Sequence, residues 1–150
     1  MNHDFFMREA IVEAKRGLAE GGIPIGSVLV RNEKIIGRGH NRRVQDDSSI
    51  LHAEIACLMN AGRQHTYRDT ILYSTLAPCY LCSGAIVQFK IPHVVIGENV
   101  NFPGAPEFLK QHGVHSENLM VTELIDLMRN FIHNHPDLWV EDIAEESSSS

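Results

Sequence analysis

Residues 76–89 read LAPCYLCSGAIVQF. This stretch decides the fold because it follows an apolar strand predicted over 70–74 and contains the start of a helix. Pro78 precedes the helix, which the pattern predicts from Cys79 to Phe89. Cys79 and Cys82 then lie on one side of the first turn. The partial positive charge of a helix N-terminus favours the thiolates that a metal requires. Taken alone, a Cys-x-x-Cys pair is also typical of a redox pair or of buried thiols.

A second short motif, His52-Ala53-Glu54, opens a helix predicted over 52–61. His52 with the two cysteines makes three ligands, the number that catalytic zinc sites use while the fourth position binds water. Glu54 is tethered close enough to accept a proton from that water. Residues two apart do not share a face of a regular helix. The motif therefore predicts that His52 lies at the very start of the helix, where its side chain can point differently.

The remaining pattern is that of an α/β protein with helices on both faces of a small mixed sheet. Asp4 is the expected N-cap of the first helix, and Gly21-Gly22 ends it. The strand predicted over 93–97 is followed by a short helix over 107–111 and by an apolar segment at 119–121. This order predicts that the apolar segment is a strand that pairs parallel with 93–97 through a crossover connection. The other predicted elements are helices over 4–20, 107–111, 122–133 and 136–144, and strands over 25–30, 35–38 and 93–97.

Length and charge limit the classes of function. The 150 residues suit one domain, predicted over 1–144, and the serine-rich tail 145–150 is expected to be a frayed, disordered end. The net charge of −6 and the lack of a basic run argue against a nucleic-acid partner. No stretch has the length and apolarity of a membrane span, and the N-terminus lacks a signal-peptide pattern. We therefore expect a cytoplasmic protein without a membrane partner.

Taken together, the two motifs match the signature of zinc nucleobase deaminases. Further segments make the chain resemble the cytidine-deaminase-like superfamily over nearly its full length, and within it the fungal-type cytosine deaminases. The segments that carry the resemblance are Gly22-Ile23-Pro24-Ile25-Gly26, Gly37-Arg38-Gly39-His40-Asn41, Thr75-Leu76-Ala77-Pro78-Cys79, Gly97-Glu98-Asn99-Val100-Asn101-Phe102 and Trp139-Val140-Glu141-Asp142-Ile143.

The resemblance implies a three-layer α/β/α fold with a five-stranded mixed sheet, a homodimer and one zinc ion per chain. It also implies conversion of cytosine to uracil and ammonia in pyrimidine salvage. Zinc-activated water (a hydroxide) would attack C4 while Glu54 carries the protons. By the same resemblance, Asn41 would bind the ring edge and Asp142 would pair with the base. Phe102 and Trp139 would line and cover the pocket, and Ile25 would pack against the substrate.

Other substrates and roles stay open at this point. Guanine, isocytosine, a modified cytosine and adenosine in transfer RNA are alternative substrates, because the zinc motifs are shared among deaminases. A non-catalytic zinc-binding domain is a further alternative, although structural zinc sites close with four protein ligands and no fourth is evident. Cys57 is expected to be a buried apolar side chain. The remaining histidines show no ligand spacing, so we expect surface or structural roles for them: His3, His40, His65, His93, His112, His115, His133 and His135.

Overall fold

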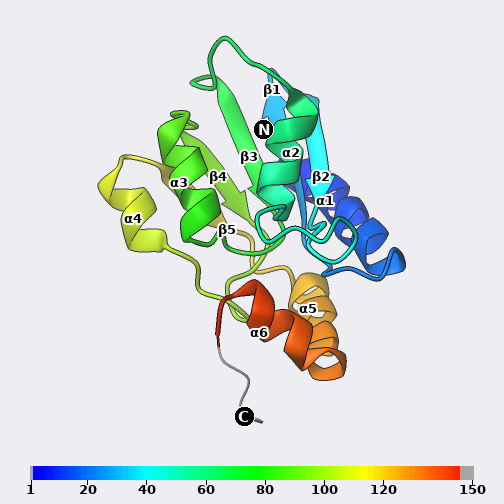
Figure 1. The fold of residues 1–150 in the computed structure, drawn as a ribbon. Helices are drawn as coiled ribbons and strands as arrows, with labels where there is room; N and C mark the ends of the chain where they lie inside the picture. Colours follow the sequence, from blue (N-terminus) through cyan, green and yellow to red (C-terminus); the bar gives the residue numbers. More distant parts are fainter. Residues whose placement is uncertain (1, 146–150) are drawn as a thin grey trace.

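The computed structural model describes residues 2–145, in which helices and strands alternate along the chain (Figure 1). In order, the elements are α1 (His3–Ala19), β1 (Gly26–Arg31), β2 (Lys34–His40), α2 (Ala53–Ala61), β3 (Thr70–Ser74), α3 (Tyr80–Gln88), β4 (His93–Ile96), α4 (Pro106–Gln111), β5 (His115–Asn118), α5 (Thr122–Asn134) and α6 (Pro136–Asp142).

The strands form one five-stranded mixed sheet in the order β2-β1-β3-β4-β5. β1 pairs antiparallel with both β2 and β3, whereas β3, β4 and β5 run parallel. The parallel half is joined by crossovers through α3 and α4, as expected for strand–helix–strand units. The predicted α/β class and the five-stranded mixed sheet are therefore confirmed.

Two apolar cores lie on opposite faces of the sheet, and a third lies beyond the ends of its strands. On one face α1 packs against Val28, Tyr73 and Val95. On the other face α2, α3 and α4 cover the sheet, as Figure 1 shows from that side. α5 and α6 lie beyond the ends of the strands, where Trp139 joins the third core. This third core matters for function because it forms one wall of the pocket described below.

Two local predictions are wrong, and both errors have a physical cause. The N-cap of α1 is Asn2 rather than Asp4, since the Asn2 side chain accepts a hydrogen bond from the Phe5 amide at 3.1 Å. The last strand lies at His115–Asn118, before the apolar segment 119–121. It is an edge strand with largely exposed polar side chains, so it has no apolar pattern, while Leu119 and Val121 pack against the core just after it.

Two of the sequence predictions concern the ends of the chain and its relation to membranes. Of the predicted disordered tail, residues 146–150 lie outside the described residues. Within 2–145, none of the helices is both long and apolar enough to cross a membrane.

One close approach fixes α2, the helix that begins at His52, against the sheet. Gly39 in β2 lies so near α2 that a Cβ atom would come within 2.6 Å of the Cys57 amide nitrogen and 2.7 Å of the Ala56 carbonyl carbon. Both of these atoms belong to the backbone and cannot rotate away. The absence of a side chain at Gly39 therefore sets how closely α2 can pack on β2.

We expect Gly39→Ala to destabilise the fold by about 1–3 kcal/mol, because the added methyl group forces α2 away from the sheet. Thermal and urea unfolding measure the loss. Gly84→Ala in α3 is the matched control, since its Cβ would meet nothing within 4 Å. Alanine favours a helix over glycine, so the control should unfold at the same or a higher temperature. Equal stability of Gly39→Ala and the natural chain would contradict this role of Gly39.

Candidate active site

The site is built where two helices begin close together. His52 and Cys79 are the N-cap residues of α2 and α3, and both have extended backbone, with ψ of 163° and −177°. Neither side chain caps its own helix. Both side chains are therefore free to turn toward each other, and Cys79 Sγ lies 3.4 Å from His52 Nδ1. The predicted position of His52, just outside the regular helix, is confirmed.

Cys82, in the first turn of α3, completes a cluster whose three ligand atoms lie within 4.8 Å of one another. Hydrogen bonds from Cys82 and from His52 lower the pKa of Cys79 to about 4. The thiolate so favoured raises the pKa of His52 to about 9, against the opposing effect of burial. The Cys79 thiolate and burial raise the pKa of the Cys82 thiol well above its ordinary value. Without a metal, a protonated His52 and a protonated Cys82 therefore surround the Cys79 thiolate, and the negative charge of this thiolate attracts a cation.

The donor set fits a zinc ion. A neutral imidazole and two thiolates are ligands that zinc binds, and a divalent cation can replace the protons of His52 and Cys82. His52 and Cys79 line the pocket, so a metal ion held by these three residues would be accessible to water from the pocket, as in a catalytic site rather than a closed structural one. Cys57 is buried elsewhere in the core, and burial raises its pKa to about 12, so its expected role as an apolar side chain is confirmed.

Glu54 is buried beside this cluster, with a relative exposure of 4%. It belongs to the first turn of α2, and its carboxyl group lies against Cys82. Burial, assisted by the negative charge of Cys79, raises the pKa of Glu54 to about 7. A carboxyl group with a pKa near neutrality both accepts and returns protons readily, which is the property of a general acid–base group.

One pocket collects the predicted site residues. Its walls include Ile25, Asn41 and Phe102 from three different loops, together with Trp139 and Asp142 from α6. The rings of Phe102 and Trp139 meet edge to face with centroids 6.1 Å apart. Cys82 is the one predicted site residue that does not line the pocket, because it lies buried behind Cys79. The lining residues that the sequence reasoning missed are Ala53, Leu76, Ala77 and Ile143.

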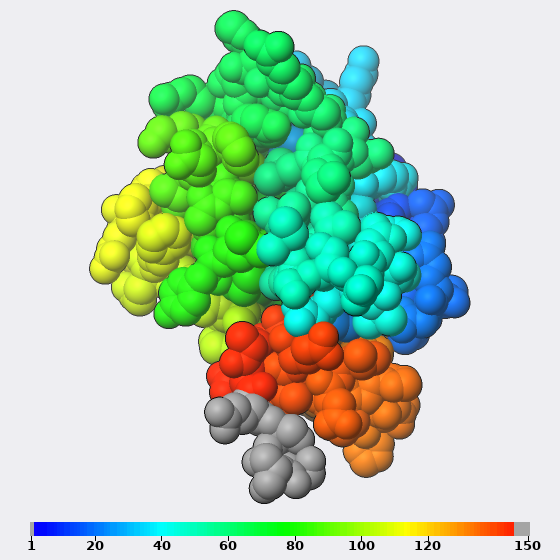
Figure 2. Space-filling model, viewed as in Figure 1, coloured from blue at the N-terminus to red at the C-terminus, as the bar shows by residue number. Residues whose placement is uncertain are grey.

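α6 is fastened over this pocket by two polar contacts. Asn41 Nδ2 donates to Asp142 Oδ1 at 3.2 Å, and Arg43 Nη2 pairs with Glu141 Oε1 at 3.2 Å. Figure 2 shows α6, in red, lying directly against the segment around residue 45. The Asp142 side chain is only 6% exposed, and burial raises its pKa. The segment that closes the pocket thus carries a carboxyl group turned inward.

Glu98 organises the loop that carries Phe102, a role that the sequence reasoning did not assign. It is fully buried, and its carboxylate accepts hydrogen bonds from the amides of Val100 and Asn101 at 2.8 and 3.0 Å. Its other oxygen accepts from Asn101 Nδ2 at 3.0 Å. A Glu between a predicted strand and a run of polar residues is a common surface feature, so only the fold reveals that this one is buried.

The comparisons with known proteins agree with this geometry. The family model for the cytidine and deoxycytidylate deaminase zinc-binding region matches residues 1–98. The chain therefore belongs to this family of zinc-binding deaminases, and the expected zinc cofactor and family resemblance are confirmed.

Individual relatives differ in what they act on. The chain is 46% identical to a cytosine deaminase of Candida albicans over 142 residues, which cover 93% of this chain and 95% of the relative. It is 38% identical to a tRNA-specific adenosine deaminase of Streptococcus pyogenes, over 85% of this chain and 87% of the relative. A solved structure from a study of tRNA:A34 deaminases superimposes with a TM-score of 0.75 at 28% identity, covering 83% of this chain and 99% of that one.

We expect Glu98→Gln to loosen residues 99–102. The neutral side chain of glutamine accepts hydrogen bonds from the backbone N–H groups of Val100 and Asn101 less strongly than a carboxylate does. The free energy of unfolding should fall by about 1–3 kcal/mol. Hydrogen exchange of the Val100 and Asn101 amides should become faster. Glu107→Gln, at an exposed position in α4, is the matched control and should change neither quantity. Unchanged exchange at both amides would show that Glu98 does not hold the loop.

Proposed function

We propose that this protein hydrolyses free cytosine to uracil and ammonia. The observation that carries the proposal is the pocket itself, which joins the metal-ligand cluster and a buried acid–base carboxyl group to a small apolar space closed by α6. The pocket is small and partly open to solvent, and apolar side chains make up most of its lining. The 46% identity to a cytosine deaminase supports the same substrate.

Recognition of the base rests on two polar side chains between aromatic walls. Asn41 is fully buried, and its side chain keeps one N–H and one lone pair beyond the bonds it makes to Asp142 and to the Arg43 amide. An amide with both capacities matches the donor and acceptor edge of a pyrimidine. The Asp142 carboxylate accepts a hydrogen bond from a ring N–H or an exocyclic amine. Phe102 and Trp139 supply the apolar surfaces that a flat ring requires.

Glu54 moves the protons of the reaction. When bound by His52, Cys79 and Cys82, zinc acidifies a water molecule so that it can attack carbon near neutral pH. Glu54 takes a proton from that water and delivers one to N3 of the ring as the C4–O bond forms. Glu54 then takes the proton of the new C4 hydroxyl group and passes it to the amine, so that the C4 carbonyl forms as the C4–N bond breaks and ammonia leaves. One cytosine and one water thus give one uracil and one ammonia.

Deamination of adenosine in transfer RNA is the second candidate, favoured by the 38% identity to a tRNA-specific adenosine deaminase. Two features weigh against it. A nucleotide within a strand enters with its ribose and phosphates attached, and α6 lies over the pocket where they would pass. The helix also carries Glu141 and Asp142, and the whole chain has a net charge of −6, which repels a phosphate backbone.

The outer side of α3 supports a homodimer as part of this proposal. Tyr80 and Leu81, in the first turn of α3, are large and largely hydrophobic, yet they are 79% and 43% exposed. Exposed apolar side chains gathered on one helix are typical of protein interfaces. We therefore propose that two copies meet through this side of α3.

Glu54→Gln should lower kcat by at least about 100-fold while leaving zinc content and the unfolding temperature nearly unchanged, because an amide cannot carry protons. Ammonia release, metal analysis and thermal unfolding measure these three quantities. Cys82→Ser is the informative comparison, since it should lose zinc as well as activity. Full activity of the Glu54→Gln enzyme would refute the assigned proton transfers.

A substrate panel decides between the two candidates. We expect ammonia release from free cytosine and none from cytidine, guanine or a transfer-RNA anticodon stem-loop. Turnover of the stem-loop or of cytidine without turnover of free cytosine would overturn the proposed substrate and leave the deaminase chemistry intact.

Asp142→Asn should raise the KM for cytosine by about 10-fold or more, because the buried carboxylate acceptor is lost. Asp137→Asn, at an exposed position on the same helix, should leave KM unchanged. If both variants have the natural KM, Asp142 does not bind the base.

A further inference from the structure

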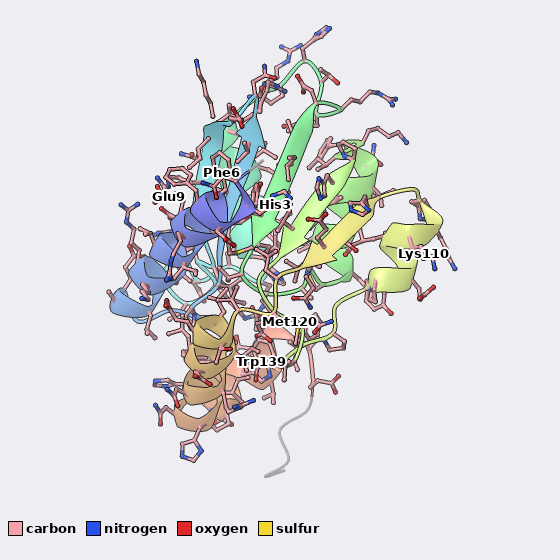
Figure 3. All side chains as sticks on the ribbon, turned by 180° about the vertical axis from the view of Figure 1, so that it is seen from behind. His3, Phe6, Glu9, Lys110, Met120 and Trp139 are labelled. Carbon is pink, nitrogen blue, oxygen red and sulfur yellow. The ribbon has the colours of Figure 1, made fainter. Side chains whose placement is uncertain are left out.

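A second group of potential metal ligands lies on the face of the sheet that α1 covers. His93 begins β4, while His115 and Glu117 alternate along β5. His93 is in register with His115 and Val95 with Glu117, so all three polar side chains project from the same face. The first turn of α1 brings His3 over this face, as Figure 3 shows. The sequence shows no ligand spacing for these histidines, and the fold brings His3, His93 and His115 together from segments far apart in the chain.

The Glu117 carboxylate is the centre of the cluster. Its Oε2 atom lies 3.0 Å from His3 Nε2 and 3.8 Å from His93 Nε2, and its Oε1 atom lies 3.4 Å from His115 Nε2. Among residues 2–145, every ion-pair partner of Glu117 is a histidine, and none is a lysine or arginine. A carboxylate surrounded by imidazole nitrogens is a set of donors for a cation.

His93 supplies the second, independent observation. Its Nε2 atom is buried and has no hydrogen-bond partner among the described residues. A buried polar atom without a partner costs free energy, so native proteins rarely leave one unexplained. This nitrogen faces the same carboxylate as His3, and a metal ion between them would use its lone pair.

His3 has the second contact that metal-binding histidines usually have. Its Nδ1 atom lies 2.7 Å from the hydroxyl of Tyr73, a bond that fixes the plane of the ring and directs Nε2 toward Glu117. Histidine ligands are typically held in this way by a hydrogen bond to the other ring nitrogen. The ring is thus oriented before any metal arrives.

We propose that His3, His93 and Glu117 bind a second divalent transition-metal ion, of which zinc is the best fit. Their ligand atoms lie within 4.8 Å of one another. Donors around tetrahedral zinc lie about 3.3 Å apart, so the distances of 3.0 and 3.8 Å bracket what zinc requires. Two imidazoles with one carboxylate suit zinc or its neighbours, whereas calcium and magnesium prefer oxygen ligands alone.

This site is separate from the catalytic cluster. His93 lies at the start of β4, whereas Cys79 follows the far end of the parallel neighbour β3. The two clusters also lie on opposite sides of the sheet, since α1 covers one and α2 and α3 form the other. A metal bound by His3, His93 and Glu117 would fasten the first turn of α1 to the edge of the sheet and stabilise the folded chain.

Metal counting tests the proposal on the full chain. Metal-free protein is dialysed against Zn²⁺, and the bound metal is measured by mass spectrometry. The natural chain should bind two zinc ions, and His93→Gln and Glu117→Gln should each bind one while keeping deaminase activity. His65→Gln, at an exposed histidine outside both clusters, is the matched control and should bind two.

Cobalt distinguishes the two sites directly. Thiolate-to-cobalt absorption reports only the cysteine cluster, so the second equivalent of Co²⁺ should add weaker bands without thiolate character. His93→Gln should lose only those weaker bands and the rise in unfolding temperature that accompanies them. A natural chain that saturates with the thiolate bands alone, or a His93→Gln variant that still binds two ions, would overturn the proposal. If the natural chain shows the weaker bands but no thiolate bands, the second site is supported and the result counts against the catalytic assignment of the cysteine cluster.

Discussion

The close approach of the first residues of α2 and α3 is the constraint on which the rest of the structure depends. α2 and α3 each begin with a residue in extended backbone, which turns His52 and Cys79 out of their helices and toward each other. Their N-termini bring partial positive charge to a place that also holds a thiolate and a buried carboxyl group. The order of the strands brings the two helices together, because α2 packs on β1 and β2 while the neighbouring strand β3 leads into α3.

Burial raises the pKa of both Glu54 and Cys79, but the two groups end in different protonation states. It favours the neutral form of Glu54, yet Cys79 stays ionised because two hydrogen bonds outweigh its desolvation. The contrast separates a group that exchanges protons near neutrality from one that binds a cation. Glu98 shows a third outcome, since a buried carboxylate that accepts several amide hydrogen bonds acts as a structural anchor for the loop carrying Phe102.

The sequence was most informative where chemistry depends on short spacing. Cys79, Cys82, His52 and Glu54 were found because covalent tethers and helix periodicity limit where their side chains can go. Asn41 and Asp142 came only from resemblance, since they lie 101 residues apart and meet through the packing of α6. β5 was misplaced because an exposed edge strand has no apolar alternation. Glu98 and the His3–His93–Glu117 cluster could not be predicted, because their environment exists only in the folded sheet.

Asn41 contacts α6, which is the last helix of the chain to be synthesised, whereas the metal-ligand cluster belongs to elements that are synthesised earlier. Chains are made from the N-terminus, and both helix starts that hold the metal-ligand cluster are complete once residue 88 has emerged from the ribosome. The wall that carries Trp139 and Asp142 emerges more than fifty residues later. A growing chain can thus acquire its metal through an open side that is closed in the finished protein. Loading of the ion and enclosure of the substrate are separated in time by the order of the elements along the chain.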